Sequence, residues 1–323
     1  MDWNSPISWL KAIRFLVTYK PDVVILQWWT SATMHMQLLI ALVSRLCLKA
    51  NLIVQLHEVA EPLEMGSLPI RLLSKRISSV IMALADGYTT HSRAVAAEAI
   101  DKYHLNSENV FTIPFGVYDS YGPSLPMQEA RAELKIEQEF VVLYFGMIRR
   151  YKGVSELLQA FNGLPPSVAR TTSLIIAGED WGDDPDVRRL VKTSPHRDNI
   201  VFRPDYVPNA LVPKYFSAAD VVALPYLTTS GSGVASIGMA YGKAILASDL
   251  EVMRELLDGY EGATFAKPGD PVNLRSRIEQ LSIERCRGEL GPYPPPHATW
   301  DDVVAQYDSI FALLKHGGQE VSA

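Results

Sequence analysis

The sequence predicts an α/β protein with two domains, each built on a doubly wound parallel sheet that is covered by helices on both faces. Apolar runs of strand length alternate with helical patterns along most of the chain, which is typical of parallel strands joined by helical crossovers. A stretch that is rich in Gly, Pro and Ser at its start separates two sets of these strands. We therefore expect an N-terminal domain at residues 1–113, a linker at 114–138 and a second domain at 139–298.

In the first domain, helical patterns and apolar runs follow one another in regular order. The expected helices are Pro6–Tyr19, Met34–Lys49, Pro69–Leu84 and Arg93–Tyr103. The expected strands are Val23–Gln27, Leu52–Leu56, Gly87–Thr90 and Val110–Ile113.

The second domain shows the same alternation. Its expected strands are Phe140–Phe145, Ser173–Ala177, Ile200–Phe202, Val221–Leu224, Ala244–Ala247 and Thr264–Phe265. A Pro-rich turn at residues 292–296 precedes a last helix, which we expect at Thr299–Lys315.

Composition excludes several classes of protein. The 323 residues are 48% hydrophobic and 20% charged, as in ordinary globular proteins, and the net charge of −6 argues against broad affinity for nucleic acid. Two cysteines, Cys47 and Cys286, imply no disulfide framework and favour a reducing compartment. The first residues lack the features of a signal peptide, and the longest apolar stretch, Met36 to Ala50, is too short to span a bilayer. We expect a cytoplasmic protein.

A cationic loop follows the strand expected at Phe140–Phe145. It begins with Gly146, carries Arg149, Arg150 and Lys152, and leads into a helical pattern. Backbone N–H groups at a helix N-terminus attract anions, Arg can grip two phosphate oxygens at once, and Lys supplies a mobile point charge. The pattern predicts a phosphate-binding loop.

A second loop of small and hydroxyl residues, Thr228 to Val234, joins the strand expected at Val221–Leu224 to an Ala-rich helix. Small residues allow backbone N–H groups to approach a ligand closely, and hydroxyls add donors without bulk. Two such loops in one domain indicate a diphosphate. The loop residues expected to contact it or the attached groups are Gly146, Arg149, Lys152, Thr229, Ser230, Gly231, Ser232, Gly233 and Val234.

An ordered set of motifs lies between about residues 139 and 315. Its members are Phe145-Gly146, Arg149, Tyr151 to Val154, Leu174 to Glu179, Tyr206 to Pro208, Ala218 to Tyr226, Ser230 to Val234 and Ala240 to Asp249. This set resembles the donor half of a family 4 glycosyltransferase. Three upstream segments resemble the later strands of the same family's acceptor half, namely Pro21 to Trp29, Ile53 to Glu58 and Ala85 to Ser92.

The resemblance implies two facing Rossmann-like domains, the GT-B arrangement, and transfer of a sugar from a nucleotide-diphospho-sugar with retention at the anomeric carbon. It assigns phosphate binding to Arg149 and Lys152, and contact with the donor sugar to His57. It also implies that the base is bound near Tyr206 and Val207. It implies no cofactor beyond the co-substrate, no metal, and a glycan, lipid-linked or small-molecule acceptor. It also implies that residues 299–323 form a helix that crosses back toward the first domain.

Two departures from the family pattern bear on activity. Thr229 and Ile237 stand where the family has two glutamates that contact the sugar and the ribose, and Ile237 cannot accept a hydrogen bond. The family's opening strand and glycine-rich loop have no counterpart, which predicts that Val23–Gln27 is an edge strand and that the first domain self-associates or binds a partner chain. A truncated enzyme and a catalytically silent, glycosyltransferase-like subunit are both consistent with these departures.

Three further interpretations remain open at this point. Gly231 and Gly233 followed by Asp249 approach a nicotinamide-dinucleotide fingerprint, although Ser236 replaces its third small residue. A nucleotide-sugar epimerase has the same architecture, but no suitable set of carboxylates and histidines can be assembled. Cations at residues 71, 75 and 76 lie on an amphipathic helix and favour peripheral contact with an anionic membrane.

Overall fold

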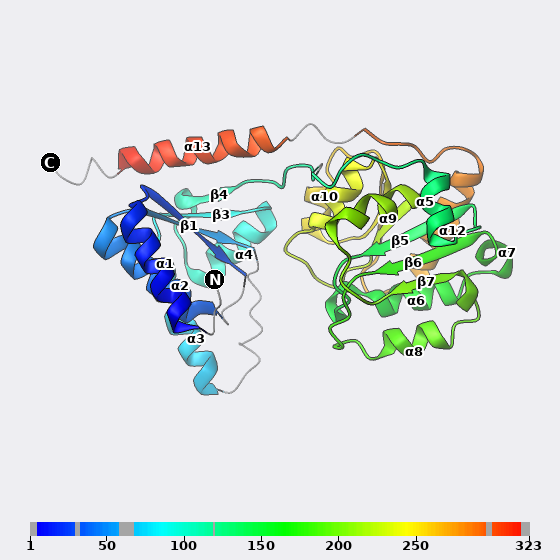
Figure 1. Cartoon of the computed structure of the whole chain (residues 1–323), viewed down its shortest axis with the longest axis horizontal. Helices are drawn as coiled ribbons and strands as arrows, with labels where there is room; N and C mark the ends of the chain where they lie inside the picture. Colours follow the sequence, from blue (N-terminus) through cyan, green and yellow to red (C-terminus); the bar gives the residue numbers. More distant parts are fainter. Residues whose placement is uncertain (1–4, 30–32, 58–67, 119, 295–298, 318–323) are drawn as a thin grey trace. The chain divides into compact units, whose positions relative to one another are not determined.

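The computed structural model describes residues 5–29, 33–57, 68–118, 120–294 and 299–317. The chain divides into two compact units (Figure 1). One comprises Met1–Pro114 with Trp300–Ala323, and the other comprises Phe115–Thr299. Each unit contains one parallel sheet, so the predicted α/β fold with two parallel sheets is confirmed.

The N-terminal unit has a four-stranded parallel sheet in the order β1-β2-β3-β4. Its strands are β1 (Val23–Trp28), β2 (Asn51–Leu56), β3 (Gly87–Thr90) and β4 (Val110–Thr112). Leu52, Ile53, Val54 and Leu56 on β2 are fully buried, as expected of a strand that is covered on both faces.

Helices cover both faces of this sheet (Figure 1). They are α1 (Pro6–Tyr19), α2 (Met34–Leu42) with its π-helical continuation (Val43–Leu48), α3 (Leu68–Leu84), α4 (Arg93–Tyr103), a 3₁₀ turn (Ser107–Asn109) and α13 (Trp300–Gly317). Val303 and Ile310 of α13 form a core cluster with Ile53 and Ile113. The last helix of the chain therefore completes the N-terminal unit.

In the described residues, β1 lies at the edge of the sheet. The carbonyl of Gln27 on this strand accepts a hydrogen bond from Nε2 of Gln37, at 3.2 Å, and Gln37 is buried on α2. This contact satisfies one backbone group of the edge strand with a side chain in place of a neighbouring strand.

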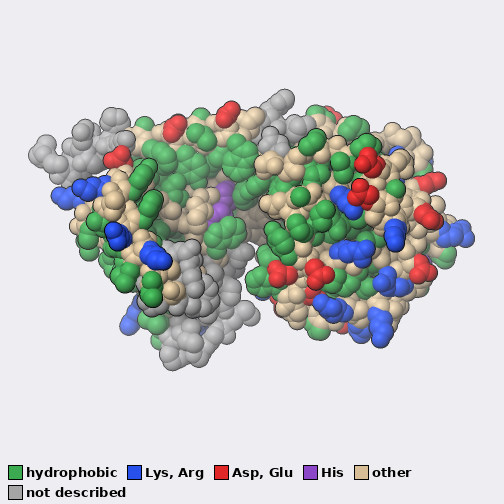
Figure 2. Space-filling view, viewed as in Figure 1, with side chains coloured by type: hydrophobic (Ala, Val, Ile, Leu, Met, Phe, Trp, Pro, Cys, Tyr) green, Lys and Arg blue, Asp and Glu red, His purple; other side chains and the backbone are tan. Residues whose placement is uncertain are grey.

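The amphipathic helix α3 buries only part of its apolar face, namely Ile81 and Met82 near its C-terminal end. Leu72 and Leu73 are 51% and 55% exposed, whereas Ser74 and Ser78 are buried. Small residues allow close helix packing, and α3 packs against α2. Figure 2 shows hydrophobic side chains at the surface of this unit. Among the described helices, none is long and apolar enough to cross a membrane.

The C-terminal unit has a six-stranded parallel sheet in the order β10-β9-β8-β5-β6-β7. Its strands are β5 (Phe140–Phe145), β6 (Thr172–Ala177), β7 (Ile200–Arg203), β8 (Val221–Leu224), β9 (Ala244–Ser248) and β10 (Ala263–Ala266). Its helices are α5 (Met127–Leu134), α6 (Val154–Asn162), α7 (Pro166–Ala169), α8 (Asp186–Lys192), α9 (Val212–Ala218), α10 (Gly233–Ala240), α11 (Glu251–Leu256) and α12 (Pro271–Cys286). Short 3₁₀ turns occur at Arg150–Lys152, Arg197–Asn199 and Asn209–Leu211.

The segment expected to be a linker, residues 114–138, is almost entirely part of the C-terminal unit. Helix α5 packs against α9, and Arg131 on α5 is 4% exposed. Its guanidinium donates to the carbonyl of Ala218 and, at 2.7 Å, to Oδ2 of Asp220. The expected boundary at residue 139 differs from the structure because this buried anchor is invisible in the local composition.

Candidate functional site

Three loops of the C-terminal unit meet where β5, β6 and β8 end, since the carboxyl ends of parallel strands share one edge of a sheet. Gly153 has φ +69°, and a Cβ atom there would lie 1.9 Å from the carbonyl oxygen of Pro225. Gly178 has φ +144°, and its Cβ would lie 2.0 Å from the carbonyl oxygen of Gly146. Glycine is required at both positions, because the loops pack backbone against backbone.

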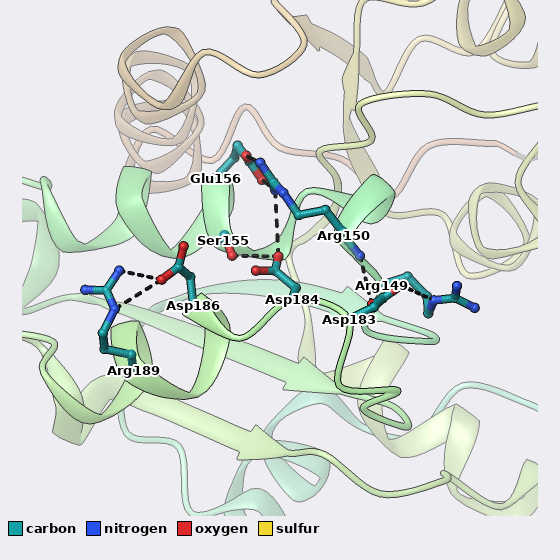
Figure 3. A network of polar contacts seen from close by, with 8 residues as sticks. All are labelled: Arg149, Arg150, Ser155, Glu156, Asp183, Asp184, Asp186 and Arg189. Carbon is teal, nitrogen blue, oxygen red and sulfur yellow. Dashed lines mark hydrogen bonds and ion pairs between the residues drawn. The ribbon is translucent and has the colours of Figure 1, made fainter. Parts of the chain in front are cut away.

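Arg149 lies in the loop after β5 and is held from two sides, of which Figure 3 shows the contact with Asp183. Its Nε donates to Oδ2 of Asp183 at 2.5 Å, and its guanidinium carbon lies 4.7 Å from the ring centroid of Trp181. The side chain is 31% exposed. Among the described residues, nothing else forms an ion pair with Arg149. The two terminal nitrogens of an oriented guanidinium are therefore available to an anion.

Lys152 ends the same loop. Its ammonium group lies 3.8 Å from the ring centroid of Tyr226 and 5.1 Å from that of Tyr151. In the described part of the chain, no carboxylate pairs with it. Aromatic faces hold a cation without neutralising it, so the charge of Lys152 is available beside Arg149.

Arg150, between these two cations, has a structural role. Its guanidinium lies 2.7 Å from Oε1 of Glu156 and 3.7 Å from Oδ2 of Asp184, and its backbone N–H donates to Oδ1 of Asp183 at 3.1 Å. Asp184 is buried and accepts a 2.6 Å hydrogen bond from Ser155. This network, drawn in Figure 3, joins the loops after β5 and β6 and fixes the start of α6.

The loop between β8 and α10 uses two of its hydroxyls, those of Ser232 and Thr229, internally. Ser232 caps α10, since its Oγ accepts from the N–H of Ala235 at 3.2 Å and also contacts the Tyr226 hydroxyl at 3.2 Å. Oγ1 of Thr229 donates to the carbonyl of Gly231 at 2.6 Å and accepts from its N–H at 3.1 Å. Among the described contacts, the backbone N–H groups of Gly233 and Val234 at the start of α10 have no partner, and these are the groups that a helix N-terminus offers to an anion.

Other expected residues have these positions. Ser230, Gly233 and Val234 lie in the loop and first turn described above; a Cβ on Gly233 would be 3.8 Å from Tyr118. Ile237 on α10 is 5% exposed and packs in the core. Tyr206 and Val207 lie beyond the end of β7. Tyr206 is 68% exposed, and in the described residues no hydrogen bond or ring contact joins it to Arg149 or Lys152.

His57 belongs to the N-terminal unit, directly after β2. Its ring stacks on Trp29 with a centroid distance of 3.9 Å and an interplanar angle of 7°. Nε2 lies 2.5 Å from Oε1 of Gln27, and the ring of His91 is 5.1 Å away. Burial, and secondarily the repulsion that a protonated His91 would exert, lowers the pKa of His57 to about 4. The ring is therefore neutral at pH 7.

Sequence reasoning did not single out Gln27, Trp29 and His91, which neighbour His57, or Gln55, which joins Gln27 to His91. The signal that could have found them is a polar side chain at or just after the carboxyl end of an otherwise apolar strand. Among the described residues, no group of three or more His, Cys, Asp or Glu side chains is arranged to hold a metal ion.

Residues 139–283 match the family model described as Glycosyl transferases group 1. Among curated proteins, the D-inositol 3-phosphate glycosyltransferase of Acidothermus cellulolyticus is 25% identical over 237 residues, which is 69% of this chain and 52% of that protein. An uncharacterized glycosyltransferase of Methanocaldococcus jannaschii is 25% identical over 256 residues, or 74% of this chain and 62% of that protein. The chain thus spans between half and two thirds of the length of these relatives.

Solved structures extend the comparison to both units. HepE from Anabaena, in complex with UDP and glucose, has a TM-score of 0.72 at 18% identity and covers 99% of this chain, which covers 83% of HepE. Sucrose-phosphate synthase from Thermosynechococcus elongatus has a TM-score of 0.69 at 19% identity, with coverages of 98% and 77%. The fold is that of GT-B glycosyltransferases, and the family match of the C-terminal unit is to glycosyltransferases as well.

Proposed function

We propose that the chain acts as a retaining, family 4 glycosyltransferase that takes its sugar from a nucleotide-diphospho-sugar held by the C-terminal unit. The observation that carries this proposal is the pairing of Arg149 and Lys152 on one loop. In the described residues, the two terminal nitrogens of Arg149 have no partner and Lys152 has no acidic partner. The first turn of α10 adds N–H groups.

This arrangement suits the electrostatic demand of the reaction. When the bond to the sugar breaks, negative charge grows on the β-phosphate of the departing nucleoside diphosphate. Fixed cations lower the barrier most when they already point at the place where charge develops. Arg149 is oriented before the ligand arrives by Asp183 and Trp181. We propose that Arg149 and Lys152 neutralise the leaving group and that no metal is required.

The remaining parts of the proposal concern the sugar, the acceptor and the location. We propose that His57 contacts the donor sugar from the N-terminal unit and that the acceptor is a glycan, a lipid-linked sugar or a small molecule. The exposed leucines and cations of α3 support peripheral contact with the inner face of the cytoplasmic membrane. Solved relatives were crystallised with UDP, UDP-glucose or ADP.

A thermal-shift panel of UDP, GDP, ADP and their sugar conjugates tests the proposal and identifies the base. A ligand at about 100 times its dissociation constant adds about 2.7 kcal/mol to the free energy of unfolding. We expect one diphosphate series to raise the melting temperature, and the rise to disappear in Arg149→Ala. The absence of a shift with every nucleoside diphosphate would contradict a donor site.

A second candidate function is a catalytically silent, glycosyltransferase-like subunit. The observation that favours it is the state of the two positions where the family has glutamates. The hydroxyl of Thr229 is committed to Gly231, and Ile237 is 5% exposed in the core. Donor hydrolysis separates the two functions. An enzyme releases nucleoside diphosphate from its donor at a measurable rate, whereas a silent subunit binds the donor and leaves it intact.

A further inference from the structure

We propose that Gln27, Gln55 and His91 are positioning residues that hold His57 as the tautomer protonated on Nε2, so that Nδ1 is presented as a hydrogen-bond acceptor for a sugar hydroxyl. The sugar as ligand rests on the proposed function above. The tautomer does not, because it follows from contacts within the N-terminal unit.

The sheet brings these side chains together. Gln27 on β1 is the register partner of Gln55 on β2, and Gln55 is the partner of Thr89 on β3. His57 and His91 follow β2 and β3 by one residue each. Side chains at matched positions of parallel strands lie on one face, so four polar groups line up along the carboxyl edge of the sheet.

The direction of the hydrogen bonds is set at one end by a backbone carbonyl. Nδ1 of His91 lies 3.0 Å from the carbonyl oxygen of Ile113, and a carbonyl can only accept. Nδ1 of His91 therefore carries the proton. Burial lowers the pKa of His91, so the ring is neutral and its Nε2 is an acceptor. Nε2 of Gln55, 3.0 Å from that atom, must donate to it.

The orientation of His91 determines in turn the hydrogen bonds of Gln55 on β2 and Gln27 on β1. With its amide oriented by His91, Gln55 turns Oε1 toward Nε2 of Gln27, which donates to it at 2.9 Å. Gln27 then has Oε1 facing Nε2 of His57, at 2.5 Å. An amide oxygen accepts, so the proton of the neutral His57 ring is on Nε2. Each amide uses one donor and one acceptor in a single direction, so the backbone carbonyl of Ile113 determines the tautomer of His57.

The other nitrogen of His57 is left for a ligand. In the described residues, Nδ1 of His57 has no partner. Stacking on Trp29, which is 57% exposed, fixes the plane of the ring. A neutral imidazole nitrogen accepts a hydrogen bond from an alcohol, whereas the opposite tautomer or the imidazolium would present an N–H there. A sugar hydroxyl is the donor of matching chemistry.

Long-range ¹⁵N NMR of the histidine rings in the full-length chain reads the tautomer directly, with the His57 signals assigned from their loss in His57→Phe. We expect His57 to be protonated on Nε2 alone. Gln55→Leu does not touch His57 but releases the Gln27 amide, so the Nδ1-protonated form of His57 should become detectable. Gln55→Glu keeps an acceptor for Gln27 and should restore the single tautomer, while His91 gains a second ring proton.

Two comparisons make the test decisive. Gln138→Leu, which removes a glutamine hydrogen bond to Asn199 in the other unit, should leave His57 unchanged. If Gln55→Leu does not fold, the second ring proton expected on His91 in Gln55→Glu still tests the proposed series of hydrogen bonds. A His57 protonated on Nδ1 in the unaltered protein, or identical His57 spectra in both Gln55 variants, overturns the proposal.

Turnover gives a separate readout. If the chain transfers or hydrolyses a donor, Gln55→Leu should lower kcat by up to about tenfold, the worth of one hydrogen bond, and leave nucleoside diphosphate affinity unchanged. A protein with the predicted tautomer but no activity would leave the positioning chain intact and reject the proposed function. An active protein in which His57 has the other tautomer would reject only the proposed positioning of His57 by Gln27, Gln55 and His91.

Discussion

In the C-terminal unit, the strands that carry the candidate site are interior strands, with β5 and β8 side by side in a six-stranded sheet, whereas β1 of the N-terminal unit lies at the edge of a four-stranded sheet. At the carboxyl ends of the strands in the C-terminal unit, the loops are joined by ion pairs and by glycines in backbone contact. At the corresponding ends in the N-terminal unit, neutral side chains are joined by hydrogen bonds. On the proposed function, the C-terminal unit is preorganised for the anionic part of the donor, while the neutral groups of the N-terminal unit suit its sugar hydroxyls.

The N-terminal unit also exposes more apolar surface on its helices. Large hydrophobic side chains more than half exposed occur on α1, α3 and α13, namely Ile7, Leu10, Phe15, Tyr19, Leu72, Leu73, Val304 and Leu313. An edge strand beside such helices is a surface on which another chain or a membrane can be bound. Five experiments test this contrast.

The largest effect is expected from Asp220→Ala, which removes the ionic anchor of the C-terminal unit. Asp220 is 3% exposed in its side chain and lies 2.7 Å from Arg131 and 2.8 Å from Arg285. Loss of one partner of a buried pair costs about 3–5 kcal/mol, because a buried charge is left uncompensated. Denaturant unfolding measures it. Asp249→Ala, which breaks an exposed pair with Arg254, should cost less than about 1 kcal/mol, and equal losses would contradict the assignment.

Gly153→Ala should cost somewhat less at its lower end, about 2–5 kcal/mol. The left-handed backbone costs about 1–2 kcal/mol, and displacement of the Pro225 carbonyl adds about 1–3 kcal/mol. Gly182→Ala is the matched control, because Gly182 has φ +75° and nothing within 4 Å of its Cβ position. It should show the first cost alone. Similar melting temperatures for the two variants would mean that the loops separate easily.

The third experiment compares the two units directly by calorimetry. Arg149→Ala and Lys152→Ala should each weaken nucleoside diphosphate binding by about 1.5–3 kcal/mol and nucleoside monophosphate binding by less, since a charge-assisted contact to the diphosphate is lost. His57→Ala should leave both affinities nearly unchanged and lower turnover or donor hydrolysis. Equal weakening of both nucleotides by the cation variants, or a weakening by His57→Ala, would remove the division of roles between the units.

The features that could be predicted from the sequence differ between the two units for physical reasons. The strand at Phe140–Phe145 was predicted to the residue, because a buried parallel strand is continuously apolar. The packing of α3 could not be predicted in this way, because the apolar pattern does not show that Ser74 and Ser78 are buried while Leu72 and Leu73 are more than half exposed. The linker was misjudged because the burial of Arg131 depends on Asp220, a residue 89 positions later.

The candidate site shows the same limit. The cationic loop could be located from the sequence, but not the use of each cation: Arg150 pairs with Glu156 and Asp184, while phosphate binding by Arg149 and Lys152 stays a prediction. The hydroxyls of Ser232 and Thr229 were expected to face a ligand, but a hydroxyl satisfies a nearby backbone group first, and both are committed in that way. The sequence identifies a side chain that can donate a hydrogen bond but not the group that accepts it. For the same reason, the role of Gln55 was not predicted.

The fourth experiment concerns the exposed surface of α3. Changing Leu72 and Leu73 together to Ser should alter folding stability by no more than about 0.5 kcal/mol each, since both are more than half exposed. We expect the unaltered chain to self-associate in light scattering and the double variant to do so less. Val272→Ser, an equally exposed position in the C-terminal unit, is the control. A monomeric parent chain would contradict self-association, and sedimentation with anionic vesicles would then identify a membrane as the partner.

The smallest effect is expected from pH, and it belongs to the N-terminal unit. Burial lowers the pKa of His57 from 6.5 to about 4, so between these values the unfolded chain binds a proton that the folded chain does not. The contribution of His57 to stability is therefore complete above pH 6.5 and decreases as the pH falls toward 4. Because the ring is partly solvated, the slope is small. His57→Gln should flatten the stability of the chain over this interval relative to the parent, measured by urea unfolding at a series of pH values. If the stability of the two proteins depends identically on pH, His57 titrates near its ordinary pKa. In that case water reaches the ring, although the stacking on Trp29 and the hydrogen bond to Gln27 are expected to keep it neutral.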